Sequence, residues 1–256
     1  MTDGKEYDFS EPIEISNGIY WVGFHEEGVG FQCNPYLMLD GEEAVIFDPG
    51  NTLDYPKVAS KVFSIIDPDQ ISHIILHHQD PDFCSSAPLF ESVISNPGLR
   101  IVTHSFSSLF SRYYGFSHGF YLVDRHEYEL TLKSGRKLRF IHTPFCHSPG
   151  AIVTYDEKNK LLFSSDIFGS VSSSWNFFAG DDYQEDMKAF HLGYMASNRH
   201  VRMVMEQLEK LEIDFILPQH GSIIKKEQIQ KNIDYLKGLQ CGIDASNKED
   251  AYKWVK

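Results

Sequence analysis

The sequence has few cysteines, and no two of them lie close enough to form a recognisable motif. The four cysteines, which are widely separated, are Cys33, Cys84, Cys146 and Cys241. In a chain of 256 residues, this spacing argues against a disulfide-linked scaffold and against a zinc site built from thiolates. The cysteine content therefore fits a protein of the reducing cytoplasm.

The sequence also lacks an excess of positive charge and any long apolar run. Its 23 lysine and arginine residues face 36 aspartate and glutamate residues, and the formal net charge is -13. This charge opposes binding to nucleic acid. No apolar stretch approaches the roughly 20 residues that a membrane-spanning helix needs, and the polar, acidic opening does not resemble a secretory signal. We therefore expect a cytoplasmic globular protein with neither a nucleic-acid nor a membrane partner.

The pattern of apolar residues predicts a mixed α/β fold. Short runs rich in β-branched and aromatic residues predict strands at 15–22, 36–39, 44–47, 71–76, 101–103, 120–123, 128–132, 138–141, 151–155, 161–163 and 215–217. Helical spacing predicts helices at 55–66, 81–95, 201–211 and 226–239. No linker rich in proline, glycine or serine interrupts the chain, so we expect a single domain over residues 1–256.

The strongest local motif follows the predicted strand 71–76. His78, Asp80 and Asp82 come at steps of two residues, at a strand end, where α/β proteins collect their ligand sites. A plainer interpretation is that Asp80, which precedes Pro81, only caps a helix. This motif alone does not decide between a helix cap and a binding site.

Three further strand ends carry side chains of the same kind. His147 lies in a Thr-Pro-Phe-Cys-His-Ser-Pro-Gly turn, Asp166 follows the strand 161–163, and His220 lies in a Pro-Gln-His-Gly turn. A single histidine after a strand is usually structural. Six such polar groups gathered at one sheet edge, however, are costly to bury unless a cation joins them. Together the four turns favour a metal site.

In this order the motifs resemble those of the metallo-β-lactamase superfamily. That resemblance implies a four-layer αββα sandwich with a two-metal site between the sheet edges. The carboxylate at Asp80 makes the pattern similar to that of the flavodiiron proteins, and most similar to their stand-alone iron cores, the oxygen-binding di-iron proteins. No segment after residue 225 has the length of a flavodoxin-like unit, so we expect no FMN in this chain.

The resemblance also implies a ligand set. For the first metal the ligands are His78, Asp80 and His147, for the second Asp82 and His220, and Asp166 bridges the two. One position departs from the family, because Phe83 stands where a histidine is usual. The second metal thus has fewer nitrogen ligands, which fits either weak occupancy or a position open to a small molecule.

The types of ligand favour iron over zinc. Two imidazoles and a carboxylate with open positions form the set that non-haem Fe(II) uses in oxygen chemistry. Three aspartates and one bridging hydroxide would neutralise two Fe²⁺ ions, and a neutral cluster is cheaper to bury than a charged one. We expect two iron ions with a hydroxo, oxo or peroxo bridge.

Several aromatic side chains follow the ligands closely in sequence and are candidates for an apolar pocket. These are Phe83, Phe145, Phe168, Trp175 and Phe177. The last two, with Phe178, follow a loop at 171–174 and are candidates for a lid. The alternative for each is ordinary core packing. As a group they suggest a cavity for O₂ or NO rather than for an extended, charged substrate.

Two residues are candidates for supporting the ligands from outside. Asp48 would accept the second N–H of a ligating imidazole, as carboxylates do around many metal sites. His77 is the other, although it could itself be the ligand with His78 turned away. Only His78 keeps the two-residue steps to Asp80 and Asp82.

Four functions remain open at this point. The first is an oxygen-binding sensor in bacterial signalling, coupled to a chemotaxis protein. The second is an O₂ or NO reductase that takes electrons from a separate flavoprotein or rubredoxin. The third is a dizinc hydrolase, and the fourth is a metal-free interaction module. The family resemblance also makes a homodimer a candidate arrangement.

Overall fold

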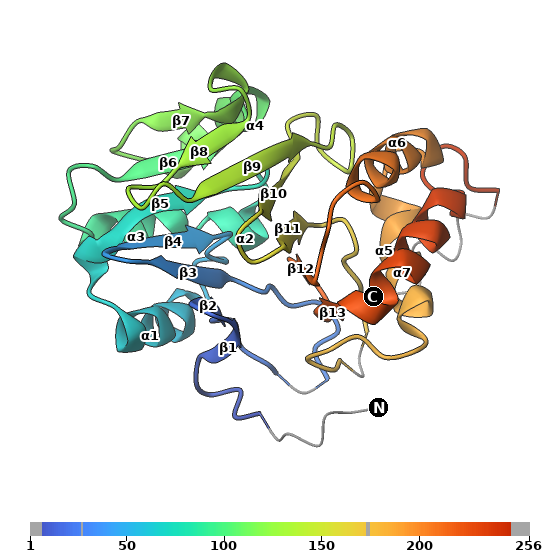
Figure 1. The fold of residues 1–256 in the computed structure, drawn as a ribbon, viewed down its shortest axis with the longest axis horizontal. Coiled ribbons are helices and arrows are strands. Elements are labelled where there is room, and N and C mark those ends of the chain that lie inside the picture. Colours follow the sequence, from blue (N-terminus) through green and yellow to red (C-terminus); the bar gives the residue numbers. More distant parts are fainter. Residues whose placement is uncertain (1–6, 27, 173–174, 247–256) are drawn as a thin grey trace.

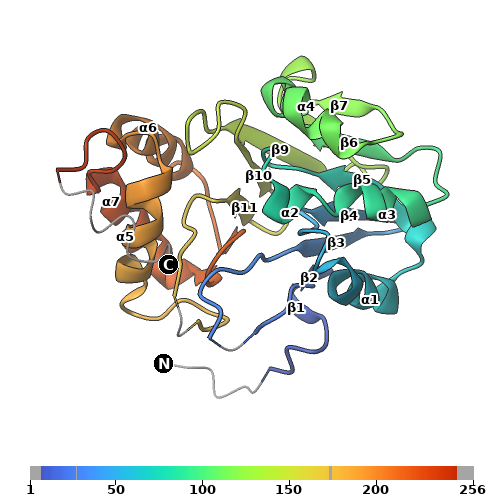
Figure 2. The same ribbon diagram turned by 180° about the vertical axis from the view of Figure 1, so that it is seen from behind.

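Two β-sheets pack face to face and helices cover both outer faces, which confirms the predicted αββα sandwich (Figures 1 and 2). The computed structural model describes residues 7–26, 28–172 and 175–246. No helix in those ranges is both long enough and apolar enough to cross a membrane.

The first sheet has the strand order β1-β2-β3-β4-β5-β6-β7. Strands β1 to β4 are antiparallel neighbours, whereas β4 to β7 run parallel. The bounds are β1 Ile13–Ser16, β2 Ile19–Trp21, β3 Tyr36–Asp40, β4 Glu43–Phe47, β5 Ile71–Ile75, β6 Arg100–Thr103 and β7 Phe120–Leu122. Strand β4 is buried throughout and β5 at all positions but His73, because both of their faces are covered.

Helices α1, α2 and α3 cover the outer face of this sheet (Figure 2). Helix α1 has a proline in its first turn and presents Val58 and Val62 at helical spacing to the sheet. The bounds are α1 Tyr55–Ile65, α2 Pro81–Cys84, α3 Ala87–Val93 and α4 Ser105–Ser111, with short 3₁₀ helices at Pro68–Gln70, Arg112–Tyr114 and Val123–Arg125.

The second sheet has the strand order β13-β12-β11-β10-β9-β8, in which only β11 and β12 run parallel. Its strands are β8 Glu129–Thr131, β9 Lys137–His142, β10 Ile152–Asp156, β11 Leu161–Ser165, β12 Phe215–Pro218 and β13 Ile224–Lys225. Its helices are α5 Tyr183–Tyr194, α6 Asn198–Leu208 and α7 Lys226–Gly238. They gather on the side of the molecule away from the first sheet (Figure 1).

The core between the sheets is rich in aromatic residues. Phe47 of β4 stacks on Phe163 of β11, with ring centroids 3.8 Å apart. Trp21, Tyr36 and Phe140 belong to the same buried cluster. This aromatic layer fixes the position of one sheet relative to the other and so places the ends of their strands side by side.

The structure corrects several predicted elements. The predicted strand 15–22 is part of a hairpin, because Gly18 turns the chain at a φ of +73° between β1 and β2. The predicted helix 81–95 is two helices, α2 and α3, separated by Ser85 and Ser86. Helices α4 and α5 and strand β13 were not predicted, and α6 spans 198–208 rather than 201–211.

Candidate metal centre

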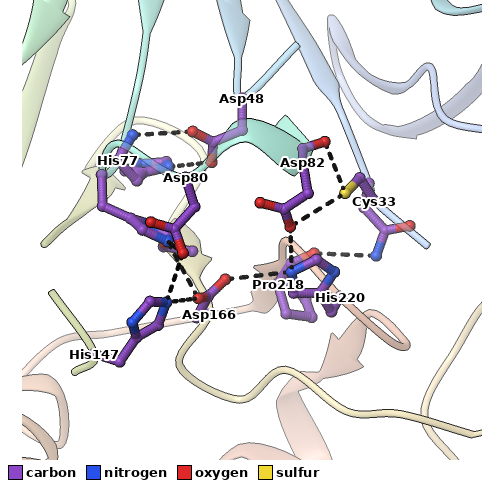
Figure 3. A network of polar contacts seen from close by, with 12 residues as sticks. Cys33, Asp48, His77, Asp80, Asp82, His147, Asp166, Pro218 and His220 are labelled. Carbon is purple, nitrogen blue, oxygen red and sulfur yellow. Dashed lines mark hydrogen bonds and ion pairs between the residues drawn. The ribbon is translucent and has the colours of Figure 1, made fainter. Parts of the chain in front are cut away.

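The first group of site residues gathers where β5, β9 and β11 end. The Nε2 atom of His147 lies 2.9 Å from the Oδ2 atom of Asp166, and His78 Nε2 lies 3.3 Å from the same oxygen. Asp80 Oδ2 lies 3.3 Å from His147 Nε2 and 3.7 Å from His78 Nε2. Figure 3 shows Asp80, His147 and Asp166 pointing toward one another.

A second group adjoins the first on the other side of Asp166. His220 Nε2 lies 3.2 Å from Asp82 Oδ2 and 3.5 Å from Asp166 Oδ1 (Figure 3). Asp166 therefore directs one carboxylate oxygen at each group. The six side chains predicted from the motifs all meet in this one place.

Buried polar atoms in the first group and on Asp166 test whether the site suits metal ions. His78 Nε2, His147 Nε2 and Asp166 Oδ1 are buried, and none has a hydrogen-bond partner. Buried polar atoms of this kind are rare unless an ion or water satisfies them. His78, His147 and Asp166 also place ligand atoms within 4.8 Å of one another. The donor set suits metal ions.

Asp80 shows why the motif at 78–82 is more than a helix cap. It occupies the N-cap position of α2 with extended backbone angles, yet its side chain makes no capping hydrogen bond. The carboxylate turns toward His78 and His147 instead. Asp82 follows in the first turn of α2 and faces His220.

Hydrogen bonds from outside orient two of the imidazoles. His220 Nδ1 donates to the backbone oxygen of Gln32 over 3.0 Å, and His78 Nδ1 lies 3.1 Å from the Ser165 hydroxyl. Because each Nδ1 has a partner outside the site, each Nε2 faces the carboxylates. The sequence motifs did not reveal Gln32 or Ser165.

The structure separates the roles of His77 and His78. Both ring nitrogens of His77 are engaged, Nδ1 by the Asp48 carboxylate and Nε2 by Thr154 Oγ1 at 2.9 Å. The backbone N–H of His77 also donates to Asp48 Oδ1 over 2.9 Å (Figure 3). His77 and Asp48 therefore stabilise the turn after β5 on the side away from the site, and His78 is the histidine that faces the site.

The turns that carry these side chains contain strained backbone. Asp48, Phe145, Ser165 and Phe168 all have φ between +44° and +67° although none is glycine. Such residues cost free energy and persist only where their surroundings hold them in place. Their concentration at the strand ends around the site is typical of a functional centre.

The electrostatics of the centre favour a cation between the carboxylates. Burial by itself lowers the pKa of His78, but Asp166 and Asp80 outweigh it and raise that pKa to about 10. The same balance raises the pKa of His147 to about 9. Burial in turn raises the pKa of Asp166, yet His78 and His147 hold it well below its usual range. Without metal, the imidazoles themselves supply the positive charge that the carboxylates require.

The five aromatic candidates differ in their relation to the site. Phe83 is fully buried, and its ring centroid lies 4.2 Å from that of His78. Phe168 is buried in the outer core beneath α5, and its backbone N–H donates to His191 Nε2 over 3.2 Å. Phe145 is 44% exposed and packs against His200.

Trp175 and Phe177 pack in the core between the sheets rather than against the metal ligands. Trp175 Nε1 donates to the Gly221 backbone oxygen over 2.8 Å, and Phe177 packs 5.6 Å from Trp21 in the core between the sheets. Ser173 and Ser174, in the loop before these aromatics, lie outside the described residues.

A loop before β3 supplies neighbours of the site that the motif analysis missed. The Phe31 ring stacks on His220 with centroids 4.1 Å apart, and Cys33 Sγ lies 3.7 Å from Asp82 Oδ2. Burial raises the pKa of the Cys33 thiol to about 11. These residues carry no recognisable spacing relative to the four turns, so only the folded chain reveals them.

Comparison with solved structures places this geometry among known proteins. The "Peroxy diiron species of chemotaxis sensor ODP" is 29% identical, with a TM-score of 0.78, and the match covers 91% of this chain and 97% of that one. The flavodiiron protein from Giardia intestinalis has the same fold, with a TM-score of 0.79 at 23% identity, over 90% of this chain and 59% of that one.

Curated relatives include longer proteins. The nitric oxide reductase of Moorella thermoacetica is 26% identical over 85% of this chain and 59% of its own length. The chain spans about three fifths of the length of the first curated relatives that it matches.

The sandwich, together with four strand-end turns that carry histidine and aspartate, defines a flavodiiron-like core of the metallo-β-lactamase type. The family model described as "ODP family beta lactamase" matches residues 31–221. The chain belongs to that family.

Proposed function

We propose that this chain holds two iron ions and binds O₂ at them as an oxygen-responsive sensor, with NO as a second candidate ligand. The ligands would be His78, Asp80 and His147 at one ion, Asp82 and His220 at the other, and Asp166 between them. The observation that carries the proposal is that the buried atoms His78 Nε2, His147 Nε2 and Asp166 Oδ1 have no hydrogen-bond partner.

The donor set supports iron. Two imidazoles with carboxylates form the combination typical of non-haem iron sites that react with oxygen. The chemotaxis sensor structure, 97% of which is covered by this chain, is that of a diiron species. An iron pair, when bound, supplies the electrons that O₂ or NO accepts.

The residues of this chain would orient the ions and limit access to them. Ser165 and the Gln32 carbonyl group fix the imidazoles of His78 and His220. Access comes from one side, because the side chains of Asp80 and Asp82 are 29% and 30% exposed, whereas those of Asp166 and His220 are 3% and 2% exposed. Phe83 is fully buried against His78 and so covers part of that imidazole with an apolar ring.

Two outputs are consistent with such a centre. A sensor is favoured by the near full-length match to a chemotaxis sensor, and its partner would then be a signalling protein. A reductase is favoured by the curated nitric oxide reductases, and it would need a separate redox donor protein. Turnover requires repeated delivery of electrons, whereas sensing requires one binding event that persists.

Anaerobic purification tests the proposal. We expect two irons per chain by elemental analysis and an optical change when O₂ is added that persists in the absence of a donor. Zinc without iron in a hydrolytically active preparation, or no bound metal, would contradict it. Adding a reduced flavoprotein or rubredoxin separates the outputs, since sustained consumption of O₂ or NO would establish the reductase.

A further inference from the structure

Cys33 lies beside the second group of site residues. Its Sγ atom, the Asp82 carboxylate and a His220 ring nitrogen all lie within 4.8 Å of one another. The Cys33 side chain is buried, and Figure 3 shows its sulfur directed toward Asp82. A thiolate, a carboxylate and an imidazole are all strong ligands for transition metals.

The backbone holds Cys33 in this position. Residues 33 and 220 form an isolated antiparallel bridge, so their side chains emerge on the same face. The adjoining Asn34 donates from its backbone N–H to the Gln219 oxygen over 2.8 Å and from its side chain to the Gly221 oxygen over 2.8 Å. The sulfur is therefore placed by a pairing that also fixes the His220 turn.

An independent observation points to a ligand at the same place. Asp166 is 2% exposed, and its Oδ1 atom, which faces His220 at 3.5 Å, has no hydrogen-bond partner. Such an oxygen calls for a cation. His220, which Oδ1 faces, belongs to the same group as Cys33 and Asp82.

We propose that Cys33 is a ligand of the second metal ion, a step that rests on the two-metal proposal above. A metal–sulfur bond forms as the S–H bond breaks, and the proton passes to solvent, so no oxidant or reductant takes part. The sulfur supplies the further donor that Phe83 does not provide. It makes the second position softer than the first and selective for iron, cobalt or zinc over magnesium or manganese.

The competing role for Cys33 is purely structural. Its thiol donates to the Asp82 backbone oxygen over 3.2 Å, and this contact alone would hold the loop without any metal. The two roles differ in one measurable property, because only a thiolate bound to a metal gives a sulfur-to-metal charge-transfer absorption.

Cobalt provides the probe. Metal-free chain titrated anaerobically with Co²⁺ should bind two ions and develop a charge-transfer band in the near ultraviolet. Cys33→Ser should lose that band, retain the first ion and bind the second at least about 10-fold more weakly, since even changes outside the ligand shell cost that much. Cys241→Ser, a matched change at a buried cysteine in the outer core of the second sheet, should keep the band and both ions.

The outcomes separate the two proposals. Two bound cobalt ions without a thiolate band, or a band that survives in Cys33→Ser, would overturn the role of Cys33 and leave the two-metal centre standing. Absence of any cobalt binding would overturn both. If Cys33→Ser does not fold, alkylation of the native chain decides, because Co²⁺ should protect Cys33 while the rate at Cys241 stays unchanged.

Discussion

The two halves of the centre are built in different ways. His78, Asp80 and His147 come from turns at strand ends, and each is part of a motif with internal spacing. The second half combines Asp82 and His220 with a loop before β3, which supplies the ring of Phe31 and the sulfur of Cys33. The motif residues of both halves are therefore encoded locally, whereas Phe31 and Cys33 join the second half only through a pairing between distant segments.

The halves also differ in the charge and softness of their donors. Two imidazoles that face two carboxylates suit a borderline ion with open positions, and one imidazole with a carboxylate and a thiolate suits a softer ion. Asp166 belongs to both, so the halves can differ in affinity while remaining coupled. The predictions below change both halves together or one at a time.

Removing the shared carboxylate should produce the largest effect. Asp166→Ala takes away the only described side chain that faces both groups, and we expect loss of both metals. Elemental analysis measures this directly, with Asp181→Ala, an exposed position, as the control. Retention of two irons in Asp166→Ala would show that this residue is not the bridge.

Acid should lower the stability of the turn that carries Asp166, and so affect both halves, because it protonates His191. Burial lowers the pKa of His191 to about 4, and its Nε2 accepts from Phe168 in the turn that carries Asp166. An unfolded histidine has a pKa of about 6.5, so the unfolded chain takes up the proton first. The contribution of His191 to the free energy of unfolding is fully present above pH 6.5 and is lost as the pH falls to about 4, on the order of 3 kcal/mol.

Urea unfolding of the metal-free chain at pH 7, 5 and 4 measures this effect. His191→Gln should lose less stability than the wild type over that range, because glutamine does not titrate. His200→Gln, a change at a less buried histidine, should follow the wild type. An equal loss of unfolding free energy in the wild type and His191→Gln between pH 7 and pH 4 would contradict the role given to His191.

Phe83→His should change the set of donors. The family resemblance implies a ligand of the second ion at this position, and the Phe83 ring lies 4.2 Å from that of His78, so an imidazole here would add a nitrogen donor and make the ligand set more like that of the reductases. We expect the optical change caused by O₂ to decay about 10-fold faster, the scale on which surroundings tune metal sites. Stopped-flow spectroscopy measures the decay, and an unchanged or slower decay would count against the role given to Phe83.

Ser165→Ala should affect the first half alone. The hydroxyl lies 3.1 Å from His78 Nδ1, so its loss leaves that imidazole less well oriented. We expect the first ion to bind about 10-fold more weakly while the second keeps its affinity. Competition titration with a chelator resolves the two ions, and equal weakening of both would show that Ser165 acts through the fold.

Local chemistry explains what the sequence could predict. The six motif residues follow strands whose apolar runs are easy to recognise, and parallel strands end on one edge, so the place where they meet was predictable. Asp80 could be interpreted as a cap or a ligand until the structure revealed which way its carboxylate turns.

Other features depend on information that the local sequence does not carry. Helix α5 was missed because its buried face mixes Tyr183 and His191 with Met187 and Phe190 and so lacks a clean apolar stripe. Cys33 was set aside because it has no cysteine partner in sequence. Its partner is instead His220, brought opposite it by long-range pairing. Such pairings arise only when both sheets have formed.

The bridge between residues 33 and 220 has a consequence beyond ligation. Cys33 precedes β3 of the first sheet, and His220 follows β12 of the second sheet. Their pairing therefore connects the two sheets directly. If one ion is bound by both residues, a shift of that ion would displace both sheets together. We therefore expect the structural change caused by gas binding at the buried centre to be transmitted to the surface through this pairing, because the two sheets can move together there.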